Sequence, residues 1–180
     1  MLVVISVASV LSIFNPNFSL NNQLIPHEVW GKKRVYSLFT SGFIHSGPRH
    51  FLSNIACFSF LAFEVEHFVG GMRFALIYLM GLILSNLCTV YAYRYDSDYR
   101  CLGASGPISS LLISYTILSP KSEIEVFDYS IIFPMLPLAI IFLAYSLIGV
   151  IFMSKNVNHC AHLFGGIWGG VVIELIQLHD

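Results

Sequence analysis

Charged residues are scarce in this chain of 180 residues, which has nine Lys and Arg and ten Asp and Glu. They make up 11% of the sequence, against about a quarter in soluble domains. Hydrophobic residues make up 56%. The net charge of −1 gives no basic field, so no nucleic-acid partner is expected. This composition excludes an ordinary soluble domain and indicates a chain whose main solvent is the lipid bilayer.

Cysteine pairs and metal-binding motifs are also missing. The four cysteines include no C-x-x-C pair, and three lie in apolar segments, where a free thiol acts as a small hydrophobe. They are Cys57, Cys88, Cys101 and Cys160. A disulfide framework, a metal site and a cofactor are therefore not expected. No basic residues precede the apolar segment Leu2–Phe14, so it is not predicted to be a cleavable signal peptide.

Six apolar segments predict an all-α, polytopic membrane protein with one domain over residues 1–180. The predicted spans are Leu2–Phe14, His50–Val69, Met72–Tyr93, Leu102–Leu118, Ile131–Met153 and Asn158–Leu178. Spans two, four and six run in the same direction. Each begins on the face that carries the long first connection, Asn15–Arg49.

Polar residues gather at the starts of these three spans, where lipid would disfavour them and where a functional role is the usual reason for them. They are His50 and Asn54 on span two, Gly103-Ala104-Ser105-Gly106-Pro107 on span four, and His159, His162 and Gly165 on span six. The rise of 1.5 Å per residue places the groups at similar depths, roughly 6–10 Å below the membrane face. We therefore expect them to meet in one pocket.

The residue types in this pocket suit acyl transfer. A serine hydroxyl needs a base to remove its proton, and His162 can serve Ser105 in this way. The oxyanion that forms needs donors, which the N–H groups of Ser105 and Gly106 at a helix N-terminus can supply. His50 and Asn54 can add side-chain donors. No acidic residue lies in this layer, so a dyad is predicted rather than a triad.

These motifs resemble those of the rhomboid family of intramembrane serine proteases, in its six-helix bacterial form. The family pattern H-x-x-x-N reads His50-Phe51-Leu52-Ser53-Asn54 here, G-x-S-G reads Gly103-Ala104-Ser105-Gly106, and A-H-x-x-G reads Ala161-His162-Leu163-Phe164-Gly165. The resemblance covers residues 39–170. It implies a Ser105–His162 dyad, an oxyanion site with His50, Asn54 and Gly106, and structural roles for Gly103 and Gly165. It also implies no cofactor, substrates that are single-pass transmembrane proteins, and a location in the bacterial cytoplasmic membrane.

The sequence departs from the family at two places. The Trp-Arg pair that is common in the first connection is replaced here by Gly31-Lys32-Lys33-Arg34-Val35-Tyr36, so different packing is expected. Many members have an aromatic residue four positions after the serine, which stacks on the catalytic histidine. Ser109 occupies that position here, so the orientation of His162 must depend on other contacts.

Basic residues raise a conflict over membrane orientation. The face with the long first connection holds seven of them, and the other face holds only Arg73 and Lys121. The positive-inside rule would place the first connection in the cytoplasm, whereas the resemblance places it outside. We adopt the orientation that the resemblance implies. The seven residues are Lys32, Lys33, Arg34, Arg49, Arg94, Arg100 and Lys155.

Other interpretations remain open at this point. His45 is expected to be a structural or capping residue, and His159 is a second candidate base one turn before His162. The chain could be an inactive rhomboid-like protein that binds membrane clients, or a transporter or scaffold in which the serine and histidine only pack. A metallohydrolase built on the histidines is disfavoured because no H-E-x-x-H motif accompanies them.

Overall fold

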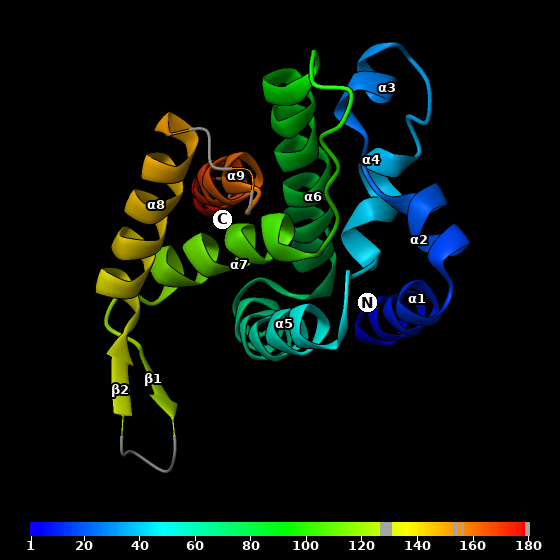
Figure 1. The fold of residues 1–180 in the computed structure, drawn as a ribbon. Helices are drawn as coiled ribbons and strands as arrows, with labels where there is room; N and C mark the ends of the chain where they lie inside the picture. The colour runs from blue at the N-terminus through cyan, green and yellow to red at the C-terminus, as the bar shows by residue number, and fades with distance from the viewer. Residues whose placement is uncertain (127–130, 153–154, 156, 179–180) are drawn as a thin grey trace.

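Helices dominate the computed structural model, which describes residues 1–126, 131–152, 155 and 157–178 (Figure 1). The helices are α1 (Leu2–Phe14), α2 (Pro16–Asn22), α3 (Pro26–Trp30), α4 (Ser37–Thr40), the 3-10 helix η1 (Ser41–Phe43), α5 (Pro48–Val69), α6 (Gly71–Tyr93), α7 (Ser105–Leu118), α8 (Met135–Ile151) and α9 (His159–Gln177). The strands are β1 (Glu123–Val126) and β2 (Ile131–Pro134), which pair antiparallel.

Six longer helices lie at the positions of the six predicted spans. Within the described residues, α5, α6 and α9 are long and apolar enough to cross a membrane. The other three, α1, α7 and α8, are apolar but have 13, 14 and 17 residues. The structure therefore confirms a mostly helical chain with three candidate membrane spans among the described residues, and the count of six spans stays a prediction.

The prediction for the fifth span was wrong at its start. Residues 131–134 form strand β2, and α8 begins only at Met135. Pro134 is extended, with a ψ of 131°, and it immediately precedes the first helical residue. A proline has no N–H to donate inside a helix, so Pro134 stands before the helix and not within it. The hairpin projects away from the helices (Figure 1). The predicted end of this span at Met153, with parts of the fourth and fifth connections, lies outside the described residues.

Span four was predicted from Leu102, but α7 begins at Ser105. Gly103 has a φ of +122°, which lies outside the helical region and which side chains other than glycine's rarely adopt. Pro107 then occupies the first turn, where its missing N–H costs nothing. The expectation from Pro107 that the chain becomes helical near Ser105 is confirmed.

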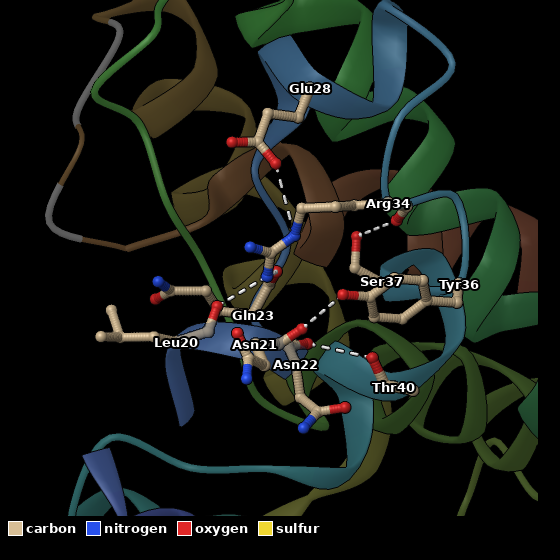
Figure 2. Close-up of polar contacts among 9 residues, drawn as sticks. All are labelled: Leu20, Asn21, Asn22, Gln23, Glu28, Arg34, Tyr36, Ser37 and Thr40. Atoms are coloured by element: carbon tan, nitrogen blue, oxygen red, sulfur yellow. Dashed lines mark hydrogen bonds and ion pairs between the residues drawn. The ribbon is translucent and has the colours of Figure 1, made fainter. Parts of the chain in front are cut away.

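Polar side chains hold the first connection together (Figure 2). Arg34 donates to the carbonyl oxygens of Leu20 at 2.6 Å and Gln23 at 3.4 Å, and its Nε lies 3.4 Å from a carboxylate oxygen of Glu28. Carbonyl groups at the end of a helix lack partners within the helix, so they need such donors. Tyr36 and Thr40 bind the two carbonyls between these, those of Asn21 and Asn22. These contacts tie the end of α2 to α3 and α4.

α7 and α9 pack closely against each other, and they adjoin in Figure 1. A Cβ atom on Gly165 would lie 2.2 Å from the carbonyl oxygen of Gly106, and one on Gly169 would lie 2.1 Å from that of Ser110. Small residues of this kind allow helix backbones to approach closely in membranes. Ser114 adds a hydrogen bond of 3.0 Å to the carbonyl of Gly169. Ser105 and His162 therefore project from two helices that are in backbone contact.

Candidate active site

A cavity of about 500 Å³ contains the four polar residues that the sequence singled out, His50, Asn54, Ser105 and His162. The other lining residues include Ser46, Tyr99, Arg100, Cys101, Lys155 and Asn158, most of which are polar. A second cavity of about 340 Å³ has mainly apolar walls from α5, α7, α8 and Ile124 of the hairpin. Asn54, Ser105 and His162 line both cavities, so the two meet at these side chains.

The start of α5 sets the positions of His50 and Asn54. Pro48 opens the helix, and residues four apart share one helix face. The Asn54 amide donates to the carbonyl of His50 at 2.9 Å, and Nδ1 of His50 lies 3.1 Å from the hydroxyl of Ser46. Both residues are thus oriented toward the cavity by contacts on their own segment.

Gly103 allows the segment before Ser105 to pass close to His50. A Cβ atom on Gly103 would lie 2.8 and 2.9 Å from two atoms of the His50 ring, so both this contact and its positive φ require glycine. The N–H of Gly103 donates to the carbonyl of Ser41 at 2.9 Å. Cys101 exchanges two backbone hydrogen bonds with Leu24. Glycine is therefore the residue that fits at this turn, and the structural role expected for Gly103 stays a prediction.

His45 is fully buried and links α1 to the start of α7. Its Nδ1 lies 2.7 Å from the Ser9 hydroxyl, and the N–H of Ala104 donates to its Nε2 at 3.4 Å. Because Nε2 accepts, a neutral ring carries its proton on Nδ1 and donates it to Ser9. Burial, and secondly the charge of His50, lower the pKa of His45 to about 4, which keeps this tautomer neutral. The role is structural, as the sequence led us to expect.

The first turn of α7 leaves N–H groups available near Ser105. The first N–H groups of a helix have no partner within it, and that of Ala104 is already bound to His45. Pro107 has no N–H. The groups that remain in this turn to stabilise an anion are those of Ser105 and Gly106. Gly106 also fits against Ser85 of α6, since a Cβ atom there would lie 2.5 Å from the Ser85 hydroxyl oxygen.

Asn158 fixes the start of α9, although the sequence gave it no role. Its Oδ1 accepts from the N–H of Ala161 and from the hydroxyl of Thr89, both at 3.1 Å. Its Nδ2 donates to Sγ of Cys101 at 3.3 Å. An Asn at this position is a favoured N-cap, and that was the signal which could have identified it. The cap places His162 one turn into the helix.

His162 lies beside Ser105 in both cavities, but within the described residues no hydrogen bond joins them. Catalytic hydrogen bonds are often long before substrate binds. Nδ1 of His162 is buried without a hydrogen-bond partner in the described part of the chain. The alternative base, His159, lines neither cavity and lies 4.9 Å from the ring of Tyr145 by ring centroids.

Lys155, which lines the polar cavity, takes part in an ion pair between two connections. Nζ of Lys155, which lies between α8 and α9, is 2.5 Å from Oδ2 of Asp96, which lies between α6 and α7. The hydrogen bond with Lys155 lowers the pKa of Asp96, and the same bond raises the pKa of Lys155. Neither residue belongs to a motif, so the sequence gave no signal for this contact.

Comparison with known proteins decides the family. The family model for the rhomboid domain matches residues 32–179. The chain belongs to the rhomboid family. It is similar to "RHOMBOID-like protein 12, mitochondrial" of Arabidopsis thaliana, with 23% identity over 85% of this chain and 50% of that protein. It is also similar to "Putative rhomboid protease YdcA" of Bacillus subtilis (strain 168), with 29% identity over 78% of this chain and 66% of that protein.

A third relative is "RHOMBOID-like protein 7" of Arabidopsis thaliana, which is 28% identical over 83% of this chain and 46% of that protein. The chain thus spans about half to two thirds of the length of these rhomboid proteins. The family and the apolar helices together identify an integral membrane protein.

Proposed function

We propose that this rhomboid protein is an intramembrane serine protease with Ser105 as nucleophile and His162 as base. The observation that carries the proposal is the convergence of His50, Asn54, Ser105 and His162 on one cavity. These residues come from α5, α7 and α9, and they are the residue types that acyl transfer needs.

The first half of the reaction forms an acyl-enzyme. As Oγ of Ser105 bonds to the scissile carbonyl carbon, its proton passes to His162. The carbonyl oxygen becomes an oxyanion, which accepts from the N–H groups of Ser105 and Gly106 and from the side chains of His50 and Asn54. When the C–N bond breaks, the leaving amine takes the proton from His162.

The second half of the reaction is hydrolysis, and the polar cavity suits it. A water molecule from this cavity attacks the acyl carbon and gives a proton to His162. The carboxylic acid product forms when Oγ of Ser105 leaves and takes that proton back. The apolar cavity on the other side of Ser105 suits a substrate segment that arrives from lipid, which supports transmembrane proteins as substrates.

Further parts of the proposal concern the membrane. We infer six spans in a single domain, with α1, α7 and α8 as the three shorter ones. The face that carries the first connection and the polar cavity lies outside the cytoplasm. The relatives come from a bacterium and from a plant, and one plant protein is named as mitochondrial. We propose the bacterial cytoplasmic membrane as the location, because the motifs follow the six-helix bacterial form.

The deciding experiment compares wild type with Ser105→Ala and His162→Ala on a helical membrane substrate in liposomes. Both variants should fold and insert, and both should lose cleavage, because nucleophile and base act as a unit. A serine-directed fluorophosphonate should label wild type and spare Ser105→Ala. Cleavage by Ser105→Ala at the wild-type rate refutes the protease. A wild type that neither cleaves nor labels favours the inactive client-binding protein.

A further inference from the structure

The ring of Phe142, on α8, lies against the ring of His162. Their centroids are 5.5 Å apart and the ring planes are inclined by 34°. Aromatic pairs in proteins have centroid distances of about 4.5–7 Å, so this is a true ring contact. One turn along both helices, Tyr145 lies 4.9 Å from His159. The pairing therefore joins α8 and α9 at two successive turns.

This contact matters because, among the described residues, no hydrogen bond to Nδ1 holds the His162 ring in place. That atom is buried without a hydrogen-bond partner in the described part of the chain. In most functional histidines the second ring nitrogen makes the bond that sets the orientation of the ring. The orientation of His162 must therefore come from packing, and the ring contacts are with Phe142 and, at 6.3 Å, with His159.

α7, the helix that carries Ser105, provides no aromatic ring beside His162 at the position one turn after Ser105. Ser109 lies one turn after Ser105, and its hydroxyl donates to the carbonyl of Ser105 at 2.7 Å. It is nearly fully buried and has no ring to place against the base. Both Ser109 and Phe142 line the apolar cavity next to His162. The aromatic contact thus comes from α8, across this cavity from Ser109.

We propose that Phe142 is a positioning residue for His162, so that alignment of the base depends on the position of α8. The proposal rests on the proposed role of His162 as the base. The two helices also meet at Gly149, where a Cβ atom would lie 2.2 Å from the His159 ring. Phe142 lies two turns before that point and also lines the apolar cavity. A substrate segment in this cavity would contact Phe142 and, through Phe142, would change the orientation of the His162 ring.

The first test uses Phe142→Leu, which keeps an apolar side chain but removes the ring. We expect kcat to fall roughly two- to tenfold, the range that the energy of an aromatic pair spans. The unfolding midpoint should stay close to wild type, and the fall in kcat should exceed any change in KM, which Phe142 also affects because it lines the apolar cavity. Ile140→Ala is the matched control on α8, because Ile140 is 58% exposed and lines neither cavity. It should leave kcat unchanged.

The second test moves the ring to the other wall of the cavity. In the Phe142→Ala background, Ser109→Phe places an aromatic ring one turn after Ser105, in space that the first change empties. The double variant should recover most of the kcat that Phe142→Ala loses. Loss of activity that follows the unfolding midpoint, with no recovery in the double variant, would show that Phe142 only fills space and would overturn the proposal.

A third readout does not depend on catalysis. Histidine labelled with ¹⁵N gives ring signals for His162, which can be assigned by their absence in His162→Gln. Phe142→Leu should broaden or shift them, and Ile140→Ala should not. Unchanged signals in Phe142→Leu overturn the positioning role, whatever the activity shows. Cleavage by Ser105→Ala at the wild-type rate would refute the proposed function. The ring signals would then still show whether Phe142 positions the His162 ring.

Discussion

Gly165→Ala is the most direct test of how α7 and α9 position the proposed dyad. The new Cβ would lie 2.2 Å from the carbonyl oxygen of Gly106, whereas ordinary contacts begin at 3.4 Å. The atom in the way belongs to the backbone, so no side-chain rotation relieves the clash. The two helices must separate locally by about 1 Å, next to Ser105 on one helix and one turn after His162 on the other.

The structure sets the size of the expected effects. A misplacement of about 1 Å at reacting groups can lower a rate roughly 10²-fold. Overpacking of this kind costs about 1–3 kcal/mol of stability. We therefore expect a folded variant whose kcat on a helical membrane substrate falls roughly 10²-fold. Circular dichroism in detergent confirms the fold, and titration with a denaturing detergent gives the change in stability.

Gly170→Ala is the matched control in the same helix. Its Cβ would lie 3.6 Å from the nearest atoms, which belong to the side chains of Ile113 and Ile117. Both kcat and stability should stay near wild type, with a small gain possible from alanine's better helix propensity. If Gly165→Ala cleaves at the wild-type rate, the close contact between α7 and α9 does not set the geometry of the site, and this reasoning fails.

Three further predictions concern the oxyanion donors, the membrane orientation and the buried histidine. His50→Ala and Asn54→Ala should each lower kcat by roughly 10²–10³-fold but leave measurable cleavage, because backbone donors remain; complete loss in a folded variant would contradict shared donation. A cysteine placed at Lys32 should react with a membrane-impermeant thiol reagent on intact cells, and labelling only after the cells are opened would reverse the proposed orientation. The pKa of His45 is lowered to about 4 from an ordinary 6.5, so the unfolded chain takes up the proton first and stability falls as the pH drops from about 6.5 towards 4. The unfolding midpoint should show this slope, and His45→Gln should flatten it.

The helices were largely predictable because their signals are local. Apolar runs mark α1, α5, α6 and α9 to within two residues at each end. The hairpin was missed because Ile131, Ile132 and Phe133 are as apolar as the helix that follows. Hydropathy alone cannot separate a short apolar strand from the start of a helix. The signal that was available is Pro134, which breaks the helix between the two elements.

The convergence of the site residues was predictable for a different reason. His50, Ser105 and His162 begin spans that run in the same direction, so the topology alone brings them to one face. The contacts of Asn158 and Phe142 were not predicted, since both join different elements and no motif marks them. Asn158 binds Thr89 and Cys101, and Phe142 contacts a residue on the next helix.

The two halves of the proposed site differ in how they are held. α7 and α9 meet through their backbones at Gly165 and Gly169, where any added atom clashes with a carbonyl oxygen. α8 meets α9 at Gly149 through the His159 side chain, and at Phe142 through two rings. Side-chain contacts can repack at small cost, whereas backbone contacts cannot. The pair that carries Ser105 and His162 should therefore stay fixed while α8, on the side of the apolar cavity, adjusts to a substrate.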